Sequence, residues 1–414
     1  MSELLVEESI LGTILKEPFL LQDADLKSEY FKFVEHQNIL SAMKTLASKG
    51  QPIDIITLLT QSDPVSFGGA SKLEKIKKMA NEPKFESYLD ILQERWREDR
   101  KLNILEIAKY ENWNLTKITT ELNNLASNKV NDYNHIKDLM LKVAEAPWQE
   151  QKTQLGVNTG LKALQNATSG WQNGELIIIA ARPSMGKTDV LLHLAKNAGW
   201  SNCIPIIFSL EMNAESLSKR LIASVGPYNR GKLKNPYKEL SDAQKDVWFP
   251  TIGRVSETNI EIFDNSDQTI PEMRMKIRKI KSLNPAKQII VFIDYLTLIK
   301  PVNDFNGNMH LATSEISKSL KSLAKEFDCP VISLAQLSRS VEKRMDKRPM
   351  LSDLRESGSI EEDADVVMFL YRDAYYSKNE QDNTLELIIA KQRNGGVGTI
   401  CAQYNKFTGA ISDL

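Results

Sequence analysis

Residues 176–195 read LIIIAARPSMGKTDVLLHLA, and this stretch decides the fold of the larger part of the chain. The apolar run Leu176 to Ala180 shows no polar alternation, which predicts a strand covered on both faces. After a loop that ends in Gly-Lys-Thr, apolar residues recur at helical spacing, at Val190, Leu191, Leu194 and Ala195. Strand, loop and helix in this order are the setting in which proteins bind phosphate.

The loop offers the groups that a nucleoside triphosphate needs. Its backbone amides and the helix N-terminus can surround the β-phosphate, while Lys187 neutralises the β and γ oxygens and the Thr188 hydroxyl holds Mg²⁺. We therefore expect ATP to be bound by Ser184, Met185, Gly186, Lys187 and Thr188. Ala181 replaces the first glycine of the general motif. A chance Gly-Lys-Thr in a βα turn is the alternative.

Two carboxylates follow other apolar runs. Asp294 ends the run Ile289 to Ile293, at the edge where α/β proteins bind ligands, so it is expected to hold Mg²⁺ together with Thr188. Because no glutamate follows Asp294, the base that activates the attacking water must come from another strand. Glu211 is the candidate, since it follows the run Ile204 to Ser209, a predicted strand beside the phosphate loop. The alternative for Asp294 is a carboxylate that only caps a turn, and the alternative for Glu211 is a surface glutamate at the start of a helix.

Three further polar residues could act on the γ-phosphate. Gln336 ends the run Val331 to Ala335, and its neutral amide could sense that phosphate by a hydrogen bond. The segment Leu385 to Gln403 contains Asn-Gly-Gly between two β runs, which predicts a hairpin. Lys391 and Arg393 lie two residues apart on it and share a face, so they could reach a nucleotide bound by a neighbouring subunit. An ordinary strand-end glutamine and solvated surface cations are the alternatives.

The chain changes character along its length. Residues 1–110 show apolar positions at helical spacing and predict a small all-α domain. Residues 111–154 are polar and Asn-rich, as in a linker, but a short apolar stripe at about 134–144 predicts a helix that docks onto a neighbour. Residues 155–414 alternate apolar runs with helical patterns, which predicts an α/β domain with a mainly parallel sheet.

The amino-acid composition limits which binding partners and which cellular compartment we expect. Lys plus Arg total 53 against 54 for Asp plus Glu, so a nucleic-acid site must be local. The three cysteines, Cys203, Cys329 and Cys401, have neither zinc-site nor disulfide spacing, which favours a reducing cytoplasm. The most apolar stretch, Ile289 to Ile299, is too short to span a bilayer and is interrupted by Asp294. We expect no membrane segment.

Several blocks together resemble the DnaB family of replicative DNA helicases. They are Ala180 to Thr188 (AARPSMGKT), Phe208 to Met212 (FSLEM), Ile293 to Leu296 (IDYL), Gln336 to Glu342 (QLSRSVE), Lys347 to Glu361 (KRPMLSDLRESGSIE) and Ala390 to Gly395 (AKQRNG). Fainter similarity runs through the first 60 residues, so the resemblance covers nearly the whole chain. Blocks in the family's own order are far more specific than one phosphate loop.

The resemblance implies an α/β RecA-like P-loop NTPase with a smaller all-α N-terminal domain. It further implies a homo-hexameric ring that hydrolyses ATP with Mg²⁺, translocates 5′ to 3′ on single-stranded DNA, and works with a primase and a helicase loader. Glu211 would be the catalytic base, and Lys391 and Arg393 would act on the neighbour's nucleotide. A loop with Arg355, Glu356 and Gly358 would grip the DNA backbone through its amides, a contact independent of sequence.

Two departures and two other functions stay open at this point. Asp189 stands where the family usually has a small or hydroxyl residue and adds negative charge near the nucleotide, while Thr297 replaces a common glutamine. The first alternative is an ATP switch without motor activity, such as a loader or recombinase. The second is a small-molecule kinase, in which Lys391, Arg393 and the loop with Arg355 would have no function.

Overall fold

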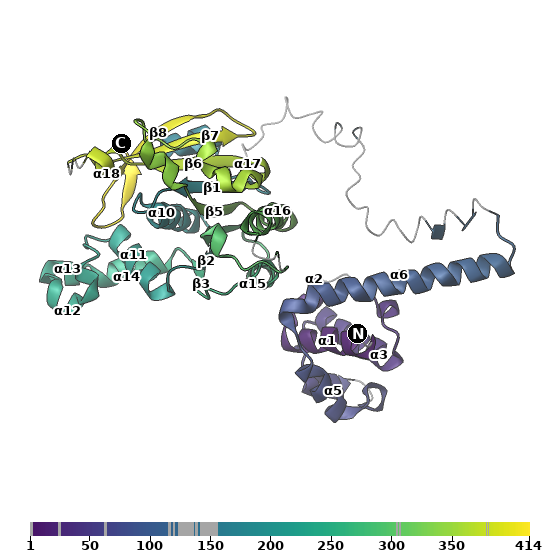
Figure 1. Cartoon of the computed structure of the whole chain (residues 1–414). Coiled ribbons are helices and arrows are strands. Elements are labelled where there is room, and N and C mark those ends of the chain that lie inside the picture. Colours follow the sequence, from purple (N-terminus) through teal and green to yellow (C-terminus); the bar gives the residue numbers. More distant parts are fainter. Residues whose placement is uncertain are drawn as a thin grey trace. The chain divides into compact units, whose positions relative to one another are not determined.

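The computed structural model describes residues 3–23, 26–61, 64–114, 117–118, 121–122, 136, 140, 156–303, 305, 308–377, 379 and 381–414. The chain divides into two compact units, Met1–Thr153 and Gln154–Leu414 (Figure 1). No helix among the described residues combines the length and apolar character needed to cross a membrane.

The first unit is helical, as predicted. Among the residues described up to Asn114, its helices are α1 (Glu3–Lys16), α2 (Leu20–Asp23), α3 (Val34–Ser48), α4 (Ile55–Gln61), α5 (Gly69–Lys78) and α6 (Phe85–Tyr110), with three short 3-10 turns. Val6, Ile10 and Ile14 of α1 are fully buried at helical spacing. Gly12 of α1 lets α5 approach closely, because a Cβ there would lie 2.0 Å from the Ile76 carbonyl oxygen. This local fit explains why α1 and α5 pack so tightly.

The second unit is built on one nine-stranded sheet in the order β3-β2-β4-β5-β1-β6-β7-β8-β9. The strands are β1 (Leu176–Ala181), β2 (Ile204–Ser209), β3 (Glu261–Phe263), β4 (Ile289–Asp294), β5 (Val331–Gln336), β6 (Val366–Tyr371), β7 (Thr384–Gln392), β8 (Gly398–Tyr404) and β9 (Ile411–Asp413). Strands β1 to β6 pair in parallel, and β6 to β9 pair antiparallel. Each predicted apolar run is therefore a strand, and the predicted hairpin is β7 and β8.

Helices cover both faces of this sheet (Figure 1). One face packs against α9 (Lys162–Thr168), α10 (Lys187–Trp200) and α11 (Ala214–Val225), and the other against α15 (Ile270–Leu283), α16 (Met309–Phe327) and α17 (Gly358–Asp363). Three short helices, α12 (Pro236–Glu239), α13 (Asp242–Asp246) and α14 (Trp248–Ser256), follow α11, and α18 (Asp373–Ser377) follows β6. The continuous apolar runs are thus explained by burial on both faces.

The structure corrects the predicted strand order. The strand that precedes Glu211, β2, was expected beside the phosphate-loop strand, but β1 lies between β5 and β6, and β2 lies between β3 and β4. Sequence adjacency is a poor guide here because a doubly wound sheet inserts later strands between earlier ones. Glu211 nevertheless reaches the same edge of the sheet, since β2 runs parallel to β1 with its carboxyl end at that edge.

Two other expectations have different outcomes. The docking helix at about 134–144 falls outside them except at Ile136 and Met140, whose side chains are exposed. The expected DNA-gripping loop is helical instead. Arg355 and Glu356 belong to the 3-10 helix η9 (Leu351–Ser357), and Gly358 is the first residue of α17. Helical backbone continues through this segment because Leu354 and Ile360 on either side are both buried against α16 and the sheet.

Candidate nucleotide-binding and hydrolysis site

The phosphate loop joins the carboxyl end of β1 to the N-terminus of α10. Gly186 is the N-cap of α10 and has φ of 96°, a conformation that favours glycine, and Ser184 also has a positive φ of 66°. Gly186 also has little room for a side chain, because a Cβ there would lie 3.3 Å from the Tyr404 ring. The loop thus leads into the N-terminus of a 14-residue helix, whose first amides have no partner within the helix and can bind an anion.

Thr188 and Asp294 meet at this edge. The Thr188 hydroxyl donates a 3.0 Å hydrogen bond to the Asp294 Oδ2 atom, although the two residues are 106 positions apart. Asp294 is only 2% exposed, and this burial raises the pKa of its carboxyl group, while the Thr188 bond opposes the rise. A buried carboxylate beside a hydroxyl at the mouth of a phosphate loop fits Mg²⁺, which prefers oxygen ligands and keeps several waters.

Lys187 lies between these oxygens and the neighbouring strand. Its Nζ atom donates a 3.3 Å hydrogen bond to the Ala335 carbonyl of β5. Burial lowers the pKa of the Lys187 ammonium group, while the carboxylates of Asp294 and Glu211 oppose that shift. A partly desolvated cation attracts phosphate more strongly than a solvated one, because less water must be displaced.

Glu211 and Gln336 approach the same space from two other strands. Ser209 of β2 is paired with Asp294 of β4, and Glu211 follows two residues later with an exposed side chain. Its charge acts on both Lys187 and Asp294. Gln336 is paired with Ala181, the last residue of β1, and is exposed at the end of β5. Both predicted residues therefore lie at the mouth of the phosphate loop.

Asp189 does not add a free charge near the nucleotide, which corrects the expectation from sequence. Its carboxylate is 4% exposed and accepts a 2.5 Å hydrogen bond from the Tyr404 hydroxyl. Arg230 and Arg220 lie 2.7 and 3.3 Å from its Oδ1 atom. Burial and the Asp189 charge raise the pKa of Tyr404 to about 12. The aspartate is thus neutralised by partners that no local sequence signal could reveal.

Lys391 and Arg393, the hairpin cations, lie at the edge of the sheet opposite the phosphate loop. The Lys391 Nζ atom donates to the carbonyls of Glu361 and Ala364 at the end of α17, at 2.5 and 2.7 Å. Arg393 donates to the Glu362 carbonyl at 2.7 Å and lies 3.4 Å from the Asp365 carboxylate. Burial lowers the pKa of Lys391, and the nearby Arg393 charge lowers it further. The two residues do share a side, as predicted, and both contact the end of α17.

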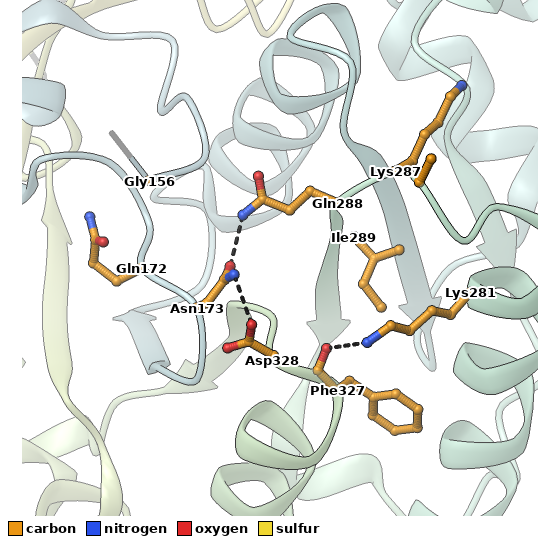
Figure 2. Close-up of a pocket in the computed structure, with 10 residues that line it drawn as sticks. Gly156, Gln172, Asn173, Lys281, Lys287, Gln288, Ile289, Phe327 and Asp328 are labelled. Atoms are coloured by element: carbon orange, nitrogen blue, oxygen red, sulfur yellow. Dashed lines mark hydrogen bonds between the residues drawn. The ribbon is translucent and has the colours of Figure 1, made fainter. Parts of the chain in front are cut away.

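A pocket of about 400 Å³ also opens at this opposite edge (Figure 2). It is lined by residues that precede β1, β4 and β5, among them Asn173, Gln288 and Asp328. These side chains bind one another, since Gln288 donates to Asn173 at 2.7 Å and Asn173 donates to Asp328 at 3.4 Å. The pocket is therefore separate from the phosphate loop, and its walls are held by their own hydrogen bonds.

Comparisons with known proteins agree with this geometry. Family models for the DnaB-like helicase C-terminal and N-terminal domains match residues 156–413 and 2–94. The replicative DNA helicase DnaB of Geobacillus stearothermophilus is 37% identical over 426 residues, which cover 97% of this chain and 93% of that protein. A solved DnaB-like replicative helicase, described with its interactions with primase, matches with 35% identity and a TM-score of 0.65 over 99% of each chain.

A second relative, the replicative DNA helicase DnaC of Bacillus subtilis (strain 168), is 36% identical over 440 residues, which cover 97% of this chain and 93% of that protein. Both domain models match in their proper order, and the similarity to full-length relatives extends over nearly the whole chain. The chain belongs to the DnaB-like family of replicative DNA helicases, whose members hydrolyse ATP to unwind DNA.

Proposed function

We propose that six copies of this chain form a ring that encloses one DNA strand, translocates along it 5′ to 3′ and separates the duplex at the replication fork. The position of Arg393 relative to the phosphate loop supports the assembly of several copies. The loop follows the carboxyl end of β1, whereas Arg393 lies beside the amino end of the same strand. The Arg393 amide donates to the Asp365 carbonyl, and the Asp365 amide donates to the Leu176 carbonyl at the start of β1.

That separation argues against action within one copy. A strand of six residues such as β1 spans roughly 16 Å at about 3.3 Å per residue, much farther than an arginine side chain reaches. We therefore propose that Arg393 acts on a nucleotide held by another copy. Contact between the phosphate-loop edge of one copy and the hairpin edge of the next is head-to-tail, and such contacts form a ring where the rotation between successive copies closes. The number of six subunits and the direction of travel are inferred from the resemblance to the DnaB family.

The chemistry at the shared site follows from the residues of both edges. Lys187 neutralises the β and γ oxygens, and Thr188 and Asp294 are the residues that would hold Mg²⁺. Glu211 polarises the attacking water as general base, and Gln336 senses the γ-phosphate through its amide. Arg393 and Lys391 of the neighbouring copy stabilise the charge that develops on the transferred phosphoryl group. Hydrolysis under this proposal needs both edges, and therefore two copies of the chain.

The DNA strand would be held by the segment of Arg355, Glu356 and Gly358. Glu356 carries a negative charge, so its contribution to phosphate binding is its backbone amide. We further propose that residues 111–154 link the two domains. A primase and a helicase loader are the proposed protein partners, and the cytoplasm is the proposed location.

Replacing the trans-acting arginine tests the shared site. Arg393→Ala should lower DNA-stimulated ATP turnover by roughly a thousandfold or more while leaving nucleotide binding intact. Lys318→Ala removes the same charge from an exposed position of α16 and is the matched control, with turnover unchanged. Normal turnover in Arg393→Ala would contradict the proposal.

A forked duplex distinguishes the motor from an ATP switch without motor activity. A 5′ to 3′ motor should separate a fork that carries a 5′ single-stranded tail, and should leave a duplex with only a 3′ tail intact. Hydrolysis stimulated by DNA without separation of either substrate would favour the switch. Separation of the 3′-tailed duplex alone would reverse the proposed direction.

A further inference from the structure

The hairpin cations are attached to the helix that begins at the proposed DNA segment. The last carbonyls of a helix have no partner within it and attract cations. At the end of α17 the Glu361 carbonyl is bound by Lys391 and the Glu362 carbonyl by Arg393, and Lys391 also binds the carbonyl of Ala364, the first residue after the helix. The other end of α17 is Gly358, directly after η9. A single six-residue helix therefore separates the two functional ends.

Asp365 links Arg393 to the core of the sheet at this junction. It is 5% exposed, and its Oδ2 atom accepts hydrogen bonds from the Leu176 amide at 2.8 Å and from Lys321 at 2.6 Å. Lys321 also donates to the Gly174 carbonyl at 2.7 Å, so this side of the carboxylate is tied to β1 and α16. The other oxygen, Oδ1, faces Arg393 at 3.4 Å. One carboxylate thus joins the core of the sheet to the cation.

We propose that Asp365 is a positioning residue for Arg393, and that α17 transmits DNA binding at its N-terminal end to the hairpin cations at its C-terminal end. If bound DNA displaces Gly358, the carbonyls of Glu361 and Glu362 would move, and Lys391 and Arg393 would move with them. Asp365 would limit how far Arg393 moves, because the Asp365 carboxylate is bound to the Leu176 amide of β1. DNA would then stimulate hydrolysis in the neighbouring copy through the copy that grips the strand. This inference rests on the proposed action of Arg393 between subunits.

The variant Asp365→Asn tests the positioning role. An asparagine oxygen can still accept from the Leu176 amide, but the neutral side chain no longer attracts Arg393. We expect the DNA-stimulated kcat to fall by roughly tenfold to a hundredfold, with the KM for ATP unchanged and the stimulation by oligo-dT reduced toward one. Glu175→Gln is the matched control, since this half-buried carboxyl at the same edge binds Asn394 and the glutamine keeps that bond. It should retain full stimulation.

The outcomes separate this inference from the function on which it rests. If Arg393→Ala turns over ATP normally, the shared site itself is wrong. If Arg393→Ala is inactive but Asp365→Asn has the wild-type kcat and stimulation, only the positioning role is overturned. A purely structural role for Asp365 would lower the thermal midpoint and the yield of assembled protein, with kcat and stimulation preserved in the assembled fraction.

Hydrogen exchange on the unmodified chain tests the transmission without any variant. With a nonhydrolysable ATP analogue present, addition of oligo-dT should change amide protection in peptides covering residues 358–365 and also in those covering residues 389–396. A change confined to the first group would overturn the proposed route through α17. This measurement remains decisive even if Asp365→Asn fails to fold.

Discussion

The Thr188 hydroxyl donates a 3.0 Å hydrogen bond to the Asp294 carboxylate, which joins the first turn of α10 to the end of β4. This bond brings together two oxygen groups from segments 106 residues apart. It also explains why a buried carboxylate is tolerated there, since burial alone would strongly disfavour its charged form. The pair is the most direct structural sign of a metal-assisted phosphate site in the described part of the chain.

Removal of the hydroxyl should separate metal binding from nucleotide binding. Thr188→Val keeps the shape of the side chain but lacks the oxygen, so we expect hydrolysis to fall by roughly a hundredfold or more. A fluorescent ATP analogue titrated with Mg²⁺ should bind more weakly, whereas its affinity in EDTA should match the wild type. Thr188→Ser retains the hydroxyl and is the control. Equal Mg²⁺ dependence in the valine and serine variants would remove Thr188 from the metal site.

Glu211 should be needed for turnover but not for binding. Glu211→Gln removes the basic oxygen while preserving size, and we expect kcat to fall by roughly 10²–10⁴ with little change in nucleotide affinity. Glu215→Gln lies four residues later in α11, where the glutamate pairs with Lys219 at the surface, and should hydrolyse normally. An active Glu211→Gln would require a different base.

Asp189 should contribute to stability rather than to nucleotide affinity. Asp189→Ala would leave Arg220, Arg230 and Tyr404 without their shared partner. Because both arginines keep partial contact with water, we expect a loss of about 2–3 kcal/mol, below the full penalty for breaking a buried pair. Thermal unfolding with and without ATP would measure the loss. A large gain in nucleotide affinity at unchanged stability would show that the charge acts on the nucleotide after all.

The free energy of unfolding should depend on pH because of Lys196. Burial lowers its pKa from 10.5 to about 8, with Arg254 adding to the shift. The folded state therefore binds this proton less readily than the unfolded state, so stability should rise as the pH increases from about 8 toward 10.5. The cost of the charged form at neutral pH is roughly 3 kcal/mol at most.

The variant Lys196→Met lacks the titrating group and should be more stable than the wild type at neutral pH. The difference between their unfolding midpoints should shrink across that pH window. A difference that stays constant with pH would mean that the ammonium group is solvated in the folded protein.

The strands and the phosphate loop could be predicted because their signals are local. Ile289 to Ile293 and Val331 to Ala335 are apolar throughout, since parallel strands are covered on both faces. Asp294 and Gln336 end two of the strands and Glu211 follows a third, and the carboxyl ends of these strands share one edge, so their convergence follows from fold class alone. Prediction therefore worked where residue order along the chain matched position in space.

The remaining features depend on long-range packing that no window of sequence contains. The order of β2 and β4 relative to β1 is set by later strands. The neutralisation of Asp189 by Tyr404 joins residues 215 positions apart, and the Asp365 contact with Leu176 joins residues 189 positions apart. The opposite locations of Arg393 and the phosphate loop likewise emerge only once the antiparallel β7 is paired with β6.

We propose that ATP is held between two copies of the chain, and the mass and the ATP turnover of one sample can be measured together to test this. Light scattering with ATP and oligo-dT, followed across a dilution series, should give a six-copy assembly whose ATP turnover per chain falls as the assembly dissociates. A well-folded sample that remains a single copy under these conditions, yet hydrolyses ATP at the full rate, would contradict the claim.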